Sequence, residues 1–285
     1  MTFRPRRTAL YMPASNLRAI EKARSLPCDV VILDLEDSVT PEAKEQARVN
    51  AVDAVRAGGF GTRELVIRVN AIDTPWGAAD IAAAAASGAH AVLAPKVGDP
   101  ETVRRYHAAM AAADAGMGFW AMIESVRAIF RLEPIAEAMA ARPGCFVLGT
   151  NDLAKEMGAR LTVERTPFLG MMAQAVAAAK GYGLAALDSV YNAFDDDAGL
   201  ERQCAEARDY GFDGKTLIHP RQIDIANRLF SPSEQEIAWA EAAVAGFDDP
   251  ENRSKGAIRV GGEMVERLHL DRAHAILAMT ADRLG

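Results

Sequence analysis

An apolar run that turns acidic at its end reads VVILDLED at residues 30–37. Near-continuous apolar runs of this length are typical of strands that are buried on both faces in a parallel sheet. Seven more such runs occur in the first 220 residues, and they are TALYMP (8–13), ELVIRVNA (64–71), AVLAPKV (91–97), GFWAMIES (118–125), CFVLGTND (145–152), LAALDSV (184–190) and KTLIHP (215–220). The sequence therefore predicts eight buried parallel strands.

Amphipathic, helix-forming stretches separate these runs. One of them reads PEAKEQARVNAVDAVRAG (41–58), in which Pro41 suits the first helical turn and Gly58 the stop. Eight β-α repeats without a GxGxxG fingerprint favour a closed barrel over a doubly wound open sheet. We predict an α/β fold, a (β/α)8 TIM barrel over residues 1–230, with a C-terminal helical extension and lid.

The chain after the eighth run changes character. Helices are expected near 221–229 and 233–245, and the polar, turn-rich segment GFDDPENRSKGA (246–257) follows them. We assign 231–257 to a helix and a hinge. Residues 258–285 then form a short extended piece and a final helix, and we predict that this tail is a lid.

Composition restricts the functional class. Half of the 285 residues are hydrophobic and a quarter are charged, so the chain can bury roughly three quarters of its unfolded surface. A net charge of −7 argues against nucleic-acid binding, and no apolar run reaches the ~18 residues of a membrane span. The three cysteines lie far apart and form no CxxC pair. We therefore expect a cytoplasmic protein with neither disulfides nor structural zinc.

The active site of such a barrel is built at the carboxyl ends of the strands. The polar residues predicted there are Glu36, Asp37, Arg68, Asn70, Lys96, Glu124, Ser125, Asn151, Asp152, Asp188 and His219. Arg68 and Glu124 interrupt strongly apolar runs. Burying an unpaired charge is costly, so both side chains should be paired or should bind a ligand.

Glu124 and Asp152 end the fifth and sixth runs, which are neighbours in a barrel at about 4.8 Å spacing. Carboxylates at that separation share a proton or a cation, and two of them with waters and a substrate oxygen suit Mg²⁺, with Mn²⁺ as an alternative. Independent salt bridges to loop arginines are the other interpretation. No histidines show HExxH spacing, and we expect His219 to hydrogen-bond locally before Pro220 rather than act as a base.

Arg68 offers a planar guanidinium that can clamp a substrate carboxylate or an enolate oxygen through two hydrogen bonds. An internal ion pair with Glu36 or Asp37 is the alternative, and both can hold at once. Lys96 is interpreted as a carboxylate partner near the substrate. A Schiff-base role needs a lowered pKa, which an acidic barrel mouth opposes.

Seven motifs in order carry a family resemblance. They are ALYMPASNLRAIEKA (9–23), ILDLEDSV (32–39) followed by Lys44 and Arg48, IRVN (67–70), APKV (94–97), MIES (122–125), GTNDLAKEMG (149–158) and GFDGKTLIHPRQI (211–223). Together they resemble the citrate lyase β-subunit and malyl-CoA lyase group of the HpcH/HpaI aldolase superfamily. The resemblance implies a barrel, usually trimeric or hexameric, that uses Mg²⁺ to cleave or form a carbon–carbon bond beside a CoA or acyl-carrier thioester.

The resemblance also implies roles for single residues. Glu124 and Asp152 match the metal ligands, and Arg68 matches the substrate-binding arginine. Arg18 and Lys22 are the candidates for the CoA phosphates. The family's lid acid lies in a pattern like GxMI/VD, which here reads GEMVE (262–266), so Glu266 stands where the family has Asp. Glutamate keeps the acid chemistry but extends its reach by one methylene.

The resulting hypothesis is a Mg²⁺-dependent lyase that acts through an enolate on a short 3-hydroxydiacyl-CoA such as malyl-, citramalyl- or citryl-CoA. Arg68 and Glu266 are its expected catalytic residues, and Glu36, Asp37 and Lys96 help to bind the substrate. The alternatives are a thioesterase on the same substrates and a citrate lyase β subunit that needs an acyl-carrier protein partner. A non-catalytic binding role is the remaining possibility. We expect a homotrimer or hexamer with the lid shared between subunits, and neither a nucleic-acid nor a membrane partner.

Overall fold

The computed structural model describes residues 4–281. The predicted barrel residues 1–3 and lid residues 282–285 lie outside the described residues. The chain divides into two compact units, one spanning Arg6–Phe230 and the other beginning at Ser231. Each unit is described by itself. Within the described part of the chain, no helix combines the length and the apolar character needed to cross a membrane.

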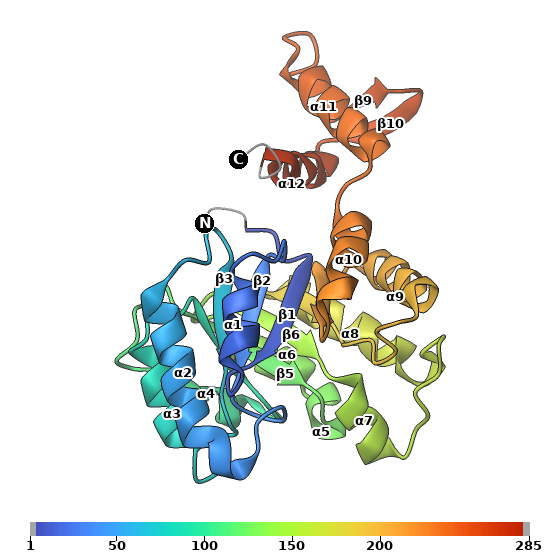
Figure 1. The fold of residues 1–285 in the computed structure, drawn as a ribbon. Helices are drawn as coiled ribbons and strands as arrows, with labels where there is room; N and C mark the ends of the chain where they lie inside the picture. The colour runs from blue at the N-terminus through green and yellow to red at the C-terminus, as the bar shows by residue number, and fades with distance from the viewer. Residues whose placement is uncertain (1–3, 282–285) are drawn as a thin grey trace. The chain divides into compact units, whose positions relative to one another are not determined.

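The first unit is a closed barrel of eight parallel strands surrounded by helices (Figure 1), as the sequence predicted. Each strand pairs with the next, and β1 closes the barrel against β8. The strands are β1 (Thr8–Pro13), β2 (Val30–Asp34), β3 (Glu64–Arg68), β4 (Ala91–Ala94), β5 (Gly118–Ile123), β6 (Gly144–Leu148), β7 (Ala185–Asp188) and β8 (Gly214–Leu217). Seven of these strands stop before the corresponding apolar run does. The predicted site residues therefore lie mostly in the loops beyond the strands.

Helices follow the strands and cover the outside of the barrel. They are α1 (Leu17–Ala23), η1 (Pro41–Ala43), α2 (Lys44–Ala57), α3 (Gly77–Ala85), α4 (Pro100–Ala109), α5 (Val126–Ile129), α6 (Leu132–Met139), α7 (Thr150–Met157), η2 (Thr166–Phe168), α8 (Leu169–Gly181), α9 (Asp197–Tyr210), η3 (Pro220–Gln222) and α10 (Ile223–Phe230). Gly58 ends α2 with a φ of +66°, a backbone conformation that residues with a Cβ rarely adopt. The predicted helix 41–58 thus begins and ends where its proline and glycine place it.

Side chains alternate along each strand between the inside and the outside of the barrel. The interior is packed by Ala9, Val30, Ile32, Val66, Ala91, Leu93, Trp120, Met122, Cys145, Val147 and Leu187. Side chains two residues further along a strand point the same way. Tyr11, Asp34, Arg68 and Glu124 therefore continue this inward row at the carboxyl end of the barrel. A polar layer caps the apolar interior there.

The second unit combines α11 (Glu234–Asp248), the antiparallel pair β9 (Ala257–Val260) and β10 (Glu263–Glu266), and α12 (His269–Ala281). Gly261 and Gly262, both with positive φ, form the two-residue turn that this hairpin requires. Phe247 of α11 packs in one cluster with Val260, Val265 and Ile276. The predicted hinge, 246–257, thus starts inside α11, and its bending remains a prediction.

Candidate active site

Arg68, the last residue of β3, lies at the centre of the polar layer. Its Nε and Nη2 donate to Asp34 Oδ1 and Oδ2 at 2.6 and 2.7 Å. Its guanidinium also lies 4.7 Å from the centre of the Tyr11 ring. Asp34 pairs with Arg68 in the β2–β3 register, so the two charges are neighbours by strand alignment. Sequence reasoning missed Asp34, although an aspartate inside an apolar run was the available signal.

The expected internal ion pairs of Arg68 also form. Nη1 lies 3.0 Å from Glu36 Oε2 and 3.7 Å from Asp37 Oδ2. Burial tends to raise the pKa of Asp34, but the charge and hydrogen bonds of Arg68 hold that pKa below its usual value. Asp34 occupies the Nε–Nη2 edge of the guanidinium, and Nη1 on the other edge already faces Glu36. The substrate clamp predicted from the sequence stays a prediction, and a substrate oxygen would share the Nη1–Nη2 edge with Glu36.

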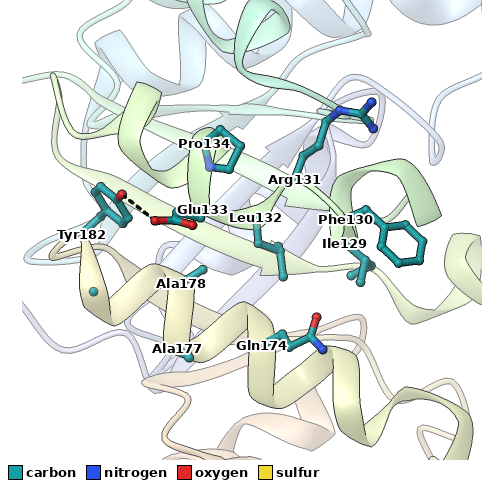
Figure 2. A pocket seen from close by; sticks show the side chains of 11 residues that line it. Ile129, Phe130, Arg131, Leu132, Glu133, Pro134, Gln174, Ala177, Ala178 and Tyr182 are labelled. Carbon is teal, nitrogen blue, oxygen red and sulfur yellow. Dashed lines mark hydrogen bonds between the residues drawn. The ribbon is translucent and has the colours of Figure 1, made fainter.

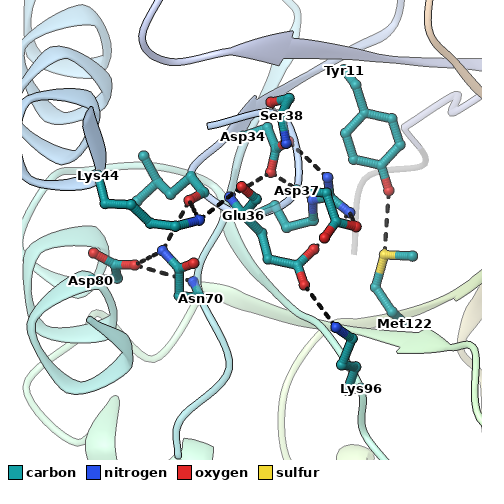
Figure 3. A network of polar contacts seen from close by, with 12 residues as sticks. Tyr11, Asp34, Glu36, Asp37, Ser38, Lys44, Asn70, Asp80, Lys96 and Met122 are labelled. Carbon is teal, nitrogen blue, oxygen red and sulfur yellow. Dashed lines mark hydrogen bonds and ion pairs between the residues drawn. The ribbon is translucent and has the colours of Figure 1, made fainter. Parts of the chain in front are cut away.

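Glu36 lies between two cations. Its Oε1 is 3.5 Å from Lys96 Nζ, an ion pair drawn as a dashed line in Figure 3. Its Oε2 faces Arg68 without a well-aligned hydrogen bond. Burial raises the pKa of Glu36, Arg68 partly offsets this, and the nearby charge of Asp37 adds to the rise. Asp37 itself is exposed. The three residues predicted to help bind substrate therefore share one cluster with Arg68.

Glu124 follows β5 and is only 3% exposed. Its Oε1 accepts a 2.7 Å hydrogen bond from the backbone N–H of Lys96. Lys96 has a φ of +53°, an uncommon conformation for a lysine and a form of strain found at functional sites. Burial raises the pKa of Glu124, and the negative charges of Glu36 and Asp152 raise it further.

Asp152 lies in the first turn of α7, directly after β6, and is half-buried. The turn at Gly149, which precedes Asp152, leaves space for the Glu124 side chain. A Cβ on Gly149 would stand 2.5 Å from Glu124 Cβ and 2.9 Å from its Oε2. Thr150 connects this turn to the segment after β7, because its hydroxyl donates a 2.9 Å hydrogen bond to Ser189 Oγ. A glycine at position 149 therefore leaves the room that the Glu124 side chain occupies.

The donor set fits Mg²⁺. Among residues 4–281 no three His, Cys, Asp or Glu side chains converge as a metal cage. Mg²⁺ is usually held by one or two carboxylates and keeps its other positions for waters and substrate oxygens. The alternative interpretation required ion pairs between these two carboxylates and loop arginines. In the described part of the chain, the ion pairs of arginine involve neither Glu124 nor Asp152. A divalent cation would offset the repulsion that raises the pKa of Glu124.

Other predicted polar positions lie elsewhere. Asp188 is buried in ion pairs with Arg165 at 2.8 Å and Lys215 at 2.6 Å, outside the inward row. His219 accepts from the Arg221 backbone N–H at 3.2 Å and caps η3, the local role expected for it. Asp188 and His219 therefore have structural roles.

The CoA and lid candidates are exposed. Arg18 and Lys22 lie one turn apart on α1, so they share a face of that short helix. Glu266 ends β10, and its backbone N–H donates to His269 Nδ1 at 2.9 Å. Glu266 belongs to the second unit, so its role at the barrel remains a prediction.

A cavity of about 480 Å³ lies outside the barrel between the α5–α6 segment and α8 (Figure 2). Ile129, Leu132 and Ala178 supply apolar lining, and the Tyr182 hydroxyl donates to Glu133 Oε1 at 3.5 Å. It contains none of the predicted site residues.

A methyl group at position 149 tests how closely the two acidic loops must approach. Gly149 has a φ of −120°, which alanine tolerates, so Gly149→Ala adds steric conflict, mainly with Glu124 and to a smaller extent with Met122 Cε at 3.3 Å. We expect Mg²⁺ affinity to fall on the order of 10-fold to 100-fold, measured by calorimetric titration. Gly170→Ala is the matched control, because nothing lies within 4 Å of that Cβ. Equal Mg²⁺ affinity in both variants would contradict the tight approach.

Comparisons with known proteins agree with this geometry. The sequence pattern of the family described as HpcH/HpaI aldolase/citrate lyase matches residues 7–220. The chain is 42% identical over 276 residues to a (3S)-malyl-CoA thioesterase of Cereibacter sphaeroides (strain KD131 / KCTC 12085), covering 96% of this chain and 94% of the relative. It is 31% identical over 300 residues to an L-malyl-CoA/beta-methylmalyl-CoA lyase of Cereibacter sphaeroides (strain ATCC 17025 / ATH 2.4.3), covering 96% and 94%.

A solved structure is similar over nearly the whole chain. It is the protein CitE from Mycobacterium tuberculosis in complex with magnesium, acetoacetate and coenzyme A. The TM-score is 0.75 at 28% identity, and the match covers 97% of this chain and 98% of that one. The polar layer thus lies in a fold whose relatives are linked by name to CoA thioesters and magnesium.

Proposed function

Because the chain belongs to the HpcH/HpaI aldolase/citrate lyase family, we propose that it acts on a short 3-hydroxydiacyl-CoA of the malyl-CoA type. The observation that supports this most is the juxtaposition of Arg68 with the buried carboxylate Glu124 at one barrel mouth. Such a substrate carries a carboxylate, a hydroxyl and a thioester oxygen close together. A cation site beside a fixed guanidinium matches those three groups.

Each side chain has a distinct task in this proposal. Glu124 and Asp152 would hold Mg²⁺, which when bound polarises the substrate oxygens that it contacts. The Nη1–Nη2 edge of Arg68, which Glu36 also contacts, would supply positive charge where the thioester oxygen becomes negative. Asp34 keeps that charge in one orientation through its two hydrogen bonds. Lys96, whose side chain is 54% exposed and lies 3.5 Å from Glu36, would be a second positive charge for the substrate carboxylate.

Thioester hydrolysis is the reaction we propose. It adds water across the C–S bond and releases the free diacid and the CoA thiol. The 42% identity to a malyl-CoA thioesterase, against 31% to a malyl-CoA lyase, supports hydrolysis. We assign Glu36 and Asp37, which lie beside Arg68, to carry a proton from water.

Carbon–carbon cleavage is the second candidate. It is favoured by the fixed charge of Arg68, which suits an enolate, and by an acid at position 266 of the tail. This version needs the tail to act as a lid, which we place on a neighbouring subunit of a trimer or hexamer. Closure would keep water away from the enolate.

One assay separates the candidates. The purified protein is given malyl-, citramalyl- and citryl-CoA with Mg²⁺, and free thiol and keto acid are measured separately. Hydrolysis yields free thiol without keto acid, whereas cleavage yields keto acid without free thiol. Turnover that appears only after an acyl-carrier protein is added would indicate a citrate lyase β role. The absence of all three would refute the proposed substrate class.

The lid hypothesis predicts a selective defect. If Glu266 delivers the proton for carbon–carbon cleavage, Glu266→Gln should lower keto-acid formation on the order of 10²-fold or more and leave hydrolysis intact. Glu263→Gln is the matched control, because Glu263 is an exposed glutamate on the same strand. Mixing Glu266→Gln with Asp152→Asn subunits should restore part of the cleavage activity if subunits share sites. Failure to recover after verified subunit exchange would exclude sharing.

A further inference from the structure

A buried lysine lies behind the acidic loop that follows β2. Lys44, the first residue of α2, is only 6% exposed. Its Nζ donates to the backbone carbonyls of Leu35 and Glu36 at 2.9 and 2.8 Å. The ammonium also lies 5.4 Å from the centre of the Trp76 ring. Within residues 4–281 it forms no ion pair with a carboxylate, so its charge is committed to two main-chain oxygens.

A second donor, Asn70 in the segment after β3, holds the same loop. Asn70 Nδ2 donates to the Leu35 carbonyl at 2.9 Å and to Asp80 Oδ2 at 2.6 Å. Arg48, on the same helix as Lys44, donates to Asp80 Oδ1 at 2.6 Å. Figure 3 shows Lys44, Asn70 and Asp80 close together on one side of Glu36. Lys44 and Asn70 therefore converge on one carbonyl from two separate elements.

The loop segment whose carbonyls Lys44 binds includes Glu36, and the Glu36 side chain contacts Arg68 and Lys96. The Glu36 backbone N–H donates to Asp34 Oδ1 at 2.9 Å, and its carbonyl accepts from Val39 as well as from Lys44. Lys44 thus holds the carbonyls of Glu36 and of the residue before it. The Glu36 carboxylate on the other side of the backbone contacts Arg68 and Lys96.

We propose that Lys44 is a positioning residue that sets where the Glu36 carboxylate, the proton carrier proposed above, stands relative to Arg68, Lys96 and the substrate. This role rests on the proposed function. The physical reason is that a charged donor fixes carbonyl oxygens more firmly than a neutral one. A shift of about 1 Å in such a group can lower a rate on the order of 10²-fold.

The test compares three variants. Lys44→Met keeps the length and removes both donors and charge, whereas Lys44→Arg keeps donors and charge in a longer side chain. Lys215→Met is the matched control, because Lys215 is a fully buried lysine that pairs with Asp188 rather than with the β2 loop. For each we measure amide hydrogen exchange over residues 34–39, kcat, KM, Mg²⁺ affinity and Tm.

We expect Lys44→Met to speed exchange over residues 34–39 on the order of 10-fold and to lower kcat on the order of 10²-fold, with KM and Mg²⁺ affinity nearly unchanged. Lys44→Arg should recover part of kcat. Lys215→Met should lower Tm and leave exchange in that segment as in the wild type. A fall in Tm with normal exchange and normal kcat in Lys44→Met would overturn the proposal. If the wild type turns over no acyl-CoA, the proposed function fails, and hydrogen exchange alone still decides whether Lys44 holds the loop.

Discussion

Glu124→Gln is expected to lower turnover of the preferred acyl-CoA on the order of 10³-fold or more while the barrel stays folded. The amide keeps the shape of the side chain but loses the charge that a divalent cation needs. The Lys96 N–H can still donate to the amide oxygen, so the loop after β4 keeps its anchor. Steady-state kinetics measure the loss of turnover, and calorimetric titration measures the loss of Mg²⁺ binding. Circular dichroism of the same sample checks that the barrel stays folded.

Asp152→Asn should lose turnover and Mg²⁺ binding as Glu124→Gln does, if the two carboxylates share one Mg²⁺ ion. Glu133→Gln is the control, because Glu133 lines the outer cavity instead of the barrel mouth. Protons compete with Mg²⁺ for Glu124, whose pKa is raised by burial and neighbouring charge. Mg²⁺ affinity should therefore weaken as the pH falls through that raised pKa, and Glu124→Gln should flatten this dependence. Unchanged Mg²⁺ binding in either carboxylate variant would defeat the shared site.

Arg68→Lys is expected to cost on the order of 10²-fold in kcat/KM, although the charge is kept. An ammonium cannot make the parallel hydrogen bonds to Asp34 and still present an edge to the substrate. Steady-state kinetics with the preferred acyl-CoA measure the loss. Lysine is chosen over alanine because removing the charge would leave Asp34 and Glu36 buried without their partner, and folding itself would suffer.

Combining Arg68→Lys with Asp34→Asn separates orientation from charge. If Asp34 acts by orienting the guanidinium, Asp34→Asn alone should lower the rate and add little once Arg68 is lysine. Fully additive losses would mean that the two residues act separately. A near wild-type rate for Arg68→Lys would reduce Arg68 to an internal ion pair.

Much of the fold could be predicted because its signals are local. Each apolar run is long enough for a strand buried on both faces, and turn residues such as Gly58 mark where the helices end. The predicted strands extended too far at their carboxyl ends, most clearly beyond Leu148. Strand ends depend on where pairing with a neighbour stops, and a single sequence does not show that.

The candidate site was predictable in part, for a related reason. Arg68 and Glu124 were recognisable because charges inside apolar runs need partners. Asp34 was missed, and Asp188 was placed in the site region although it lies in a structural ion pair. Both errors concern which face of a strand a residue occupies. That depends on the pleat and register of the closed barrel.

Residue order alone therefore determined that eight buried strands close into a barrel and that acidic and basic side chains gather at their carboxyl ends. Hydrophobic period and strand direction dictate both, and these are properties of the local chain. Tertiary structure alone decided that Asp34 takes one edge of Arg68, that Gly149 leaves room for Glu124, and that Lys44 holds the Glu36 loop. These contacts join residues 8 to 34 positions apart and depend on ångström-scale distances between separate loops. Such distances are set when the whole barrel packs.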